Sequence, residues 1–216
     1  TKMVLICNPN NPTGTFVSHE EIKDFARQVP SDVCIVIDEA YIEFVAGIEP
    51  DGLLGLVIDH DNVVITRTFA KIYGLAGLRV GYAVGHPDLI AAFDRVRNHF
   101  GLGRIAQAGA LAALADQGWL GRVRTEVATA REALAAVARA NGLRPLPSAT
   151  NFVTIDCGAD GAFAARVLSE LGRRGVFMRM PGVAPLDRCI RVTCAPARQI
   201  AIFAEALPQA LAAARG

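Results

Sequence analysis

The sequence predicts a mixed α/β fold: a three-layer α/β/α domain built on a mostly parallel sheet, followed by a small α+β domain. Short runs rich in Val, Ile and Leu alternate with amphipathic stretches of helical period along the first half of the chain. These runs are apolar at consecutive positions, which is typical of strands covered on both faces. Alternation of such strands with helices favours parallel neighbours in the sheet.

The elements of the first domain follow from this alternation. Ser18 and Glu21 have the spacing of a capping box, which predicts a helix over 18–29. A second helix is predicted over 86–99. The predicted strands are 3–7, 33–38, 62–66 and 79–85.

From residue 103 to 140 the sequence is rich in Ala, Leu, Arg and Glu, which predicts two consecutive helices. The second begins near Trp119 and ends at Asn141 and Gly142, a pair that favours a helix C-terminus. The elements predicted beyond it are a strand (151–156), a helix (160–174), two strands (176–180 and 189–194) and a terminal helix.

This change of pattern predicts two domains. The first spans 1–120 and the second 121–216, and they are joined through a long helix at about 119–141. The chain starts with Thr1 and enters a strand-like run almost at once. We therefore expect that an N-terminal portion of the first domain is missing from it.

Composition excludes several classes of protein. Of the 216 residues, 52% are hydrophobic and 20% charged, which argues against disorder. The formal net charge of +1 gives no electrostatic case for nucleic acid or an anionic membrane as partner. No apolar run reaches the ~18 residues of a membrane span, and no signal peptide opens the chain. The five cysteines lack metal-type spacing. We expect a cytoplasmic protein with reduced thiols and no metal.

Polar residues follow the predicted strands of the first domain. "NPNNPTGT" (8–15), "DEAYIEF" (38–44) and "RTFAK" (67–71) each come after a strand, and Arg79 lies eight residues further on. Ligands of open α/β sheets bind beyond the carboxyl ends of the strands, so these residues are expected to converge. Each also has an ordinary explanation: a turn-rich loop, a turn or cap residue at Asp38, a packed ring at Tyr41.

Lys71 is the residue that favours a ligand site over these ordinary structural explanations. Lysine is rarely buried, so at the end of a strand it is either a solvated loop charge or an amine placed to react. Thr68 and Arg79 supply the hydroxyl and guanidinium that a phosphate monoester requires. A carboxylate at a buried strand end needs a cationic partner, so Asp38 is expected to face one. An amine, a phosphate site and a facing carboxylate are what a pyridoxal phosphate Schiff base requires.

At these residues the chain resembles a known family. "NPNNPTGT", "DEAYIEF" and "TFAKIYGLAGLRVGY" are similar to the signature segments of fold-type-I pyridoxal-phosphate-dependent aminotransferases, within them to the histidinol-phosphate aminotransferase branch. "SATNFV" and "CIRVTCA" fit as well. The resemblance implies an enzyme of amino-acid biosynthesis that moves an amino group between an amino acid and an oxo acid. It also implies a cytoplasmic homodimer whose large domain is present here in part.

The resemblance also implies roles in holding the cofactor. Lys71 would form the Schiff base with pyridoxal 5'-phosphate and then shuttle a proton. Asp38 would pair with the pyridine nitrogen, and Ala40 would lie against the ring. Thr68 and Arg79 would hold the phosphate.

Four further residues receive roles in the same way. Asn11 and Tyr41 would hydrogen-bond the cofactor's phenolic oxygen. Arg191 would clamp the substrate's α-carboxylate in a bidentate pair, which also explains an arginine in an apolar strand. Arg179 would contact the distal group of the substrate.

Other functions remain open at this point. A pyridoxal-phosphate-dependent decarboxylase of the threonine-phosphate type would share every one of these residues. A non-enzymatic sensor domain of a transcriptional regulator would also resemble the family. Nucleotide binding without a Schiff base is disfavoured because no Gly-rich fingerprint follows a strand. Ala70, where a serine is common, and the segment 98–107 depart from the family pattern and leave the substrate open.

Overall fold

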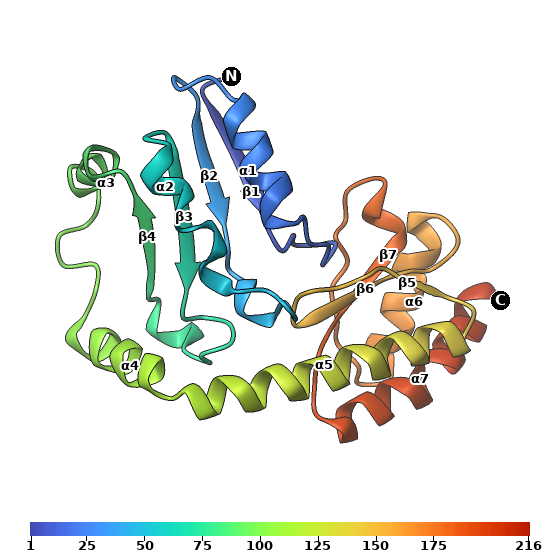
Figure 1. Ribbon diagram of the computed structural model, residues 1–216. Coiled ribbons are helices and arrows are strands. Elements are labelled where there is room, and N and C mark those ends of the chain that lie inside the picture. Colours follow the sequence, from blue (N-terminus) through green and yellow to red (C-terminus); the bar gives the residue numbers. More distant parts are fainter. The chain divides into compact units, whose positions relative to one another are not determined.

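The computed structural model describes residues 1–216 and consists of two compact units (Figure 1). Unit 1 contains Thr1–Asn10 and Phe16–Arg124, and unit 2 contains Asn11–Thr15 and Thr125–Gly216. Helix α5 (Gln117–Ala140) begins in unit 1 and ends in unit 2. The short segment Asn11–Thr15 groups with unit 2 although its chain neighbours belong to unit 1, which the sequence pattern does not indicate.

Unit 1 is built on a four-stranded sheet in the order β1-β2-β3-β4. The strands are β1 (Met3–Cys7), β2 (Cys34–Asp38), β3 (Val63–Thr68) and β4 (Gly81–Gly85). The first three run parallel, and β4 runs antiparallel to β3. The connection explains the direction of β4, because the link from β3 holds only the 3-10 turn η3 (Ala76–Leu78) and no crossover helix.

Helix α1 (His19–Gln28) begins with the predicted capping box. The Ser18 hydroxyl accepts the Glu21 backbone N–H at 3.3 Å, and the Glu21 carboxylate accepts the Ser18 N–H at 3.0 Å. Ile22 and Ala26 then pack the helix onto the sheet. This confirms the helix that the sequence predicts over these residues.

One apolar cluster holds α1 to the sheet. It joins Ile35 and Ile37 of β2 to Val63 and Ile65 of β3 and is completed by the short elements η2 (Pro50–Leu53) and α2 (Leu56–Asp59). Each fully buried aliphatic side chain of this kind contributes about 1.5–3 kcal/mol. The strand ends that carry the candidate residues are thus fixed by a packed layer beneath them.

The remaining elements of unit 1 are η1 (Ile42–Phe44), α3 (Pro87–Asp94) and α4 (Arg104–Ala115). Helix α3 ends at Asp94 and does not reach residue 99 as predicted. The Asn98 side chain accepts the Phe100 N–H at 3.1 Å, and such local bonds compete with a helix. Helix α4 packs through Ala106 and Ala110 on the residues that flank the β3–β4 link.

Unit 2 has a three-stranded antiparallel sheet in the order β5-β6-β7. Its elements after α5 are β5 (Arg144–Pro145), β6 (Phe152–Asp156), α6 (Gly161–Arg173), η4 (Leu186–Arg188), β7 (Cys189–Thr193) and α7 (Ala197–Arg215). Helix α5 ends at the predicted pair: Gly142 has φ +73°, and the Leu143 N–H bonds back to Ala138 at 3.0 Å.

The predicted strand 176–180 is reduced to one isolated bridge between Arg179 and Arg191. Pro181 follows directly, and proline has no N–H with which to extend a ladder. The core of the unit lies between the sheet and helices α6 and α7, where Ile155, Ile190 and Leu207 are fully buried.

All five cysteines are free thiols. Burial raises the pKa of Cys157 and of Cys194 to about 11, so both stay protonated at neutral pH. No helix in residues 1–216 combines the length and the apolar character needed to cross a membrane.

Candidate active site

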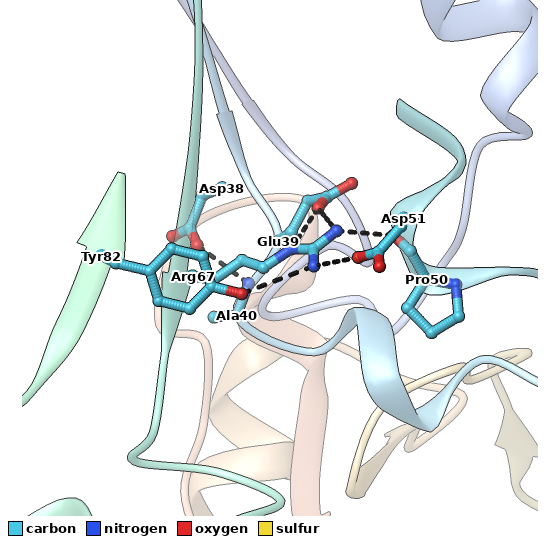
Figure 2. Close-up of polar contacts among 7 residues, drawn as sticks. All are labelled: Asp38, Glu39, Ala40, Pro50, Asp51, Arg67 and Tyr82. Atoms are coloured by element: carbon cyan, nitrogen blue, oxygen red, sulfur yellow. Dashed lines mark hydrogen bonds and ion pairs between the residues drawn. The ribbon is translucent and has the colours of Figure 1, made fainter. Parts of the chain in front are cut away.

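The carboxyl ends of β2 and β3 lie side by side in unit 1. Asp38 is paired in register with Thr66, and each strand then turns into a loop that carries candidate residues. Asp38 is half-buried, and its carboxylate accepts the Ala40 backbone N–H at 3.0 Å (Figure 2). This bond fixes the carboxylate at the tip of the sheet, where the sequence places the partner of a ring nitrogen.

Lys71 and Tyr41, which follow different strands, meet in space. The Lys71 Nζ lies 5.2 Å from the centroid of the buried Tyr41 ring. An ammonium group over an aromatic face is attracted by the ring quadrupole, so this contact orients the amine. The structure therefore brings together two of the residues that the sequence singles out.

The two predicted phosphate ligands lie at the two ends of the link between β3 and β4: Thr68 is the last residue of β3, and Arg79 follows η3. The Thr68 hydroxyl accepts the Ala70 N–H at 3.0 Å, which tightens the turn that leads to Lys71. Arg79 is exposed and adopts the left-handed conformation, with φ 52° and ψ 49°. It is the one residue other than glycine with positive φ, and its guanidinium donates to the Ala76 carbonyl at 3.0 Å. A strained residue of this kind is often found at a functional site.

Beside Asp38 lies a buried ion pair that sequence reasoning missed. Arg67 donates to the carboxylate of Glu39 at 2.8 Å, to that of Asp51 at 2.6 Å and to the Pro50 carbonyl at 2.6 Å (Figure 2). The side chain of Glu39 is fully buried and that of Arg67 is 6% exposed. Burial raises the pKa of the Glu39 carboxyl, and the Arg67 guanidinium opposes that rise.

This pair leaves Asp38 without a cation from the chain, so the cationic partner expected for Asp38 stays a prediction. The cation at the strand end is bound by Glu39, one residue further on, while Asp38 keeps its carboxylate half-exposed. The signal in the sequence was an arginine inside the apolar run that ends in β3, next to Thr68. Charged residues are almost never fully buried unless paired, so Arg67 needed a buried acid.

The first turns of α5 hold the same two loops. The Trp119 indole N–H donates to the Ile72 carbonyl at 3.1 Å, directly after Lys71. The Arg124 guanidinium donates to the Glu43 carbonyl at 2.6 Å, two residues after Tyr41. Burial raises the pKa of the Glu43 carboxyl to about 7, and one of its oxygens has no hydrogen-bond partner.

The other candidate residues lie in unit 2. Arg191 on β7 donates a hydrogen bond to the side-chain oxygen of Asn11 and stacks over the Phe152 ring, with its guanidinium carbon 4.8 Å from the centroid. Arg179 is joined to Arg191 by two backbone hydrogen bonds, of 2.7 and 3.3 Å. Directly paired residues share one face of a sheet, so the side chains of Arg179 and Arg191 leave the backbone on the same face.

The predicted residues thus form two sets. Those in unit 1 are Asp38, Ala40, Tyr41, Thr68, Lys71 and Arg79. Those in unit 2 are Asn11, Arg179 and Arg191. Lys71 with Tyr41 makes an amine held over a ring. In unit 2, Asn11 is bonded to the Arg191 guanidinium, and Arg179 is paired with Arg191 through the backbone.

Fold and comparison together define the class of protein. The pattern of the family described as "Aminotransferase class I and II" matches residues 1–207, and the chain belongs to that family. It is 39% identical to the histidinol-phosphate aminotransferase of Moorella thermoacetica over 213 residues, 98% of this chain and 54% of that protein. It is 48% identical to the aromatic amino acid aminotransferase of Mycobacterium bovis over 201 residues, 88% of this chain and 56% of that protein.

A solved structure agrees with these relatives. The histidinol-phosphate aminotransferase from Sinorhizobium meliloti in complex with pyridoxal-5'-phosphate matches with a TM-score of 0.92 and 44% identity, covering 98% of this chain and 57% of that one. The chain spans about half the length of the curated relatives it matches. The fold predicted from the sequence, that of the pyridoxal-phosphate aminotransferases, is confirmed.

Proposed function

We propose that this chain carries the catalytic residues of a pyridoxal-phosphate-dependent aminotransferase, which moves an amino group between an amino acid and an oxo acid. The placement of Lys71 supports this most directly. Of the three lysines, Lys2 and Lys23 are bound to carboxylates at 3.2 and 3.0 Å, whereas the Lys71 amine lies over the Tyr41 ring. An amine oriented by an aromatic ring and free of carboxylates suits a nucleophile.

The donor set of unit 1 fits pyridoxal phosphate. The Asp38 carboxylate suits a protonated ring nitrogen, the Lys71 amine an aldehyde, and the Thr68 hydroxyl with the Arg79 guanidinium a phosphate. Ala40 is small enough to lie against a ring. When bound, this cofactor withdraws electrons from the α carbon of an amino acid, which no side chain of the chain can do.

The chain's own residues then do the remaining work. The Lys71 amine would take the proton from the substrate's α carbon as a general base and pass it, as a general acid, to the cofactor. The Tyr41 hydroxyl would hydrogen-bond the cofactor's phenolic oxygen, a role that the family resemblance also implies for the Asn11 amide. Arg191 binds the substrate's carboxylate with the donors that its bond to Asn11 leaves free.

The arginines of unit 2 favour an anionic substrate, and two amino-group donors fit. Arg179 and Arg191 lie on paired backbone positions, and two guanidinium groups that leave the same face suit a phosphate or two carboxylates. The names of the relatives point to histidinol phosphate or to an aromatic amino acid. Of these, histidinol phosphate is our first choice, because its phosphate suits two cations. It has no carboxylate, so the carboxylate that Arg191 binds is that of the amino acid or oxo acid that exchanges the amino group with it. We further propose a homodimer in the cytoplasm, as the family resemblance implies; sedimentation of the protein tests the first and fractionation of its cells the second.

Borohydride trapping tests the proposal. The protein is incubated with pyridoxal phosphate, reduced and digested, and the labelled residue is located by mass spectrometry. We expect label at Lys71, and its loss in Lys71→Ala but not in the matched control Lys23→Ala. Equal label on Lys2 and Lys23, or full transamination activity in Lys71→Ala, would contradict the assignment.

Product analysis separates the reactions that share these residues. The aminated product of an added oxo acid is measured with histidinol phosphate, phenylalanine and glutamate as amino donors. Release of carbon dioxide in place of an oxo product would favour the decarboxylase reading.

A further inference from the structure

Thr154 is a polar residue in the interior of β6, and 0% of its surface is exposed. Its hydroxyl donates a hydrogen bond to the carbonyl of Pro12, which lies 142 residues earlier in the chain. A buried strand position is filled well by valine, and a buried hydroxyl is costly without a partner. The hydroxyl therefore serves the contact with Pro12.

Thr154 lies directly opposite Arg191 in the register of β6 and β7. The N–H and carbonyl of Arg191 bond to Arg179, so the Thr154–Arg191 pair exchanges no backbone hydrogen bonds. In such pairs the side chains approach most closely and share one face. From this face Arg191 binds Asn11 and Thr154 binds the next residue, Pro12.

The far end of the same loop is held separately. The Gly14 carbonyl accepts the Ala149 N–H at 2.8 Å, and a Cβ on Gly14 would lie 2.6 Å from the Ser148 hydroxyl oxygen. This contact fixes residues two positions beyond Pro12. The orientation of Asn11 thus depends on Arg191 and on the anchor that Thr154 provides.

We propose that Thr154 is a positioning residue that fixes the direction of the Asn11 side chain. Arginine has donors only, so the Asn11 atom that faces Arg191 is the amide oxygen, and both amide N–H groups point elsewhere. The inference rests on the proposed function in one respect, because there these N–H groups donate to the cofactor's phenolic oxygen. Without the Thr154 hydroxyl the Asn11–Pro12 segment can rotate, and the two N–H groups of the Asn11 amide no longer keep one direction.

The first experiment needs no cofactor. The side-chain amide resonances of 15N-labelled protein are recorded, and that of Asn11 is assigned by its loss in Asn11→Ala. We expect Thr154→Val to move and broaden this resonance and Thr154→Ser to leave it in place. Thr129→Val is the matched control, because it removes a threonine hydroxyl bonded within α5 of the same unit. Thr154→Ala replaces Thr154→Val if the latter fails to fold.

The second experiment titrates the visible absorbance of bound pyridoxal phosphate with pH. An N–H that donates to the ionised phenolic oxygen stabilises the ionised form. Losing this hydrogen bond is expected to raise the pH midpoint of the absorbance change by about one pH unit. We expect Asn11→Ala to show the full shift, Thr154→Val a shift in the same direction, and Thr154→Ser and Thr129→Val the wild-type midpoint.

The two experiments fail in different ways. An unchanged Asn11 resonance in Thr154→Val overturns the positioning role, whatever the cofactor does. A moved Asn11 resonance in Thr154→Val supports the positioning role. If the absorbance midpoint does not shift even in Asn11→Ala, the function assigned to Asn11 is wrong while the positioning role stands. A moved resonance together with a wild-type midpoint in Thr154→Val, while Asn11→Ala shifts, overturns the link between Thr154 and the cofactor.

Discussion

Arg191 on β7 donates a hydrogen bond to the side-chain oxygen of Asn11, a residue 180 positions earlier in the chain. The guanidinium is also stacked over Phe152. Both contacts hold it in one orientation and leave other N–H donors free, so little rotamer entropy remains to be lost when a carboxylate binds. The pair thus joins a residue proposed to bind the substrate to one proposed to bind the cofactor.

Arg191→Ala is expected to weaken substrate binding much more than it affects cofactor binding. Truncating one partner of a hydrogen-bonded charge pair costs about 2–5 kcal/mol, which here means a KM for the amino acid raised about a hundredfold. Arg191→Lys keeps the charge and loses the bidentate geometry, so its KM should lie between those of the wild type and Arg191→Ala. Steady-state kinetics measure both. Arg198→Ala on the exposed surface of α7 is the control, and an unchanged KM in Arg191→Ala would contradict the role.

The Glu39–Arg67 pair predicts a large effect on stability. Arg67→Met leaves the fully buried Glu39 carboxylate without its cation, which costs about 3–5 kcal/mol. Glu39→Gln should cost less, because Asp51 and the Pro50 carbonyl still bind Arg67. Urea denaturation measures the free energy of unfolding of each variant.

The double variant tests whether the two side chains act as a pair. Arg67→Met combined with Glu39→Gln should cost less than the sum of the single changes, because neither charge is then left unpaired. Lys2→Ala is the control: Lys2 and Asp32 are 85% and 70% exposed, and such a pair contributes at most about 1 kcal/mol. Strict additivity would show that the pair is not coupled.

Glu43 predicts a pH dependence of stability. Burial raises its pKa from 4.5 to about 7 in the folded chain, so the folded state binds the proton more tightly than the unfolded state. The contribution is fully present below pH 4.5 and is lost as pH rises through 7. Its size is about 3 kcal/mol at most.

Glu43→Gln should remove this dependence, because the amide does not titrate. Arg67, Arg124 and Glu39 contribute charges around Glu43 and remain in the variant. We expect the free energy of unfolding of the wild type to fall relative to that of Glu43→Gln between pH 5 and pH 8. Urea denaturation at several pH values decides, and parallel curves would contradict the raised pKa.

Local features of the fold were predictable from the sequence. The capping box of Ser18 and Glu21 starts α1, and Gly142 ends α5, because both act through hydrogen bonds within a few residues. The direction of β4 was not predictable in the same way. An apolar run carries no direction, and the short link through Ala76–Leu78 decides it.

The candidate site was predictable as a set of residues and less so as an arrangement. Lys71 and Asp38 stand out because charges at strand ends need a reason. The anchor between Thr154 and Pro12 spans 142 residues and leaves no trace in any local pattern. The same holds for the bond between Arg67 and Glu39. The sequence indicates that a buried arginine needs an acid, but it does not indicate which acid.

Arg79 predicts opposite effects on stability and on cofactor binding. Its left-handed backbone costs a residue with a side chain about 1 kcal/mol, a cost that glycine does not have. Arg79→Gly should therefore leave the free energy of unfolding unchanged or raise it by up to about 1 kcal/mol, since the added freedom of the unfolded chain offsets part of the gain. The same change removes the guanidinium proposed to hold the phosphate, so the affinity for pyridoxal phosphate should fall at least tenfold.

Arg79→Lys separates the two effects, because it keeps the strain and the charge and loses the paired donors. Urea denaturation and a fluorescence titration with pyridoxal phosphate measure them, and a glycine variant that binds the cofactor as tightly as wild type would exclude Arg79 from the phosphate site.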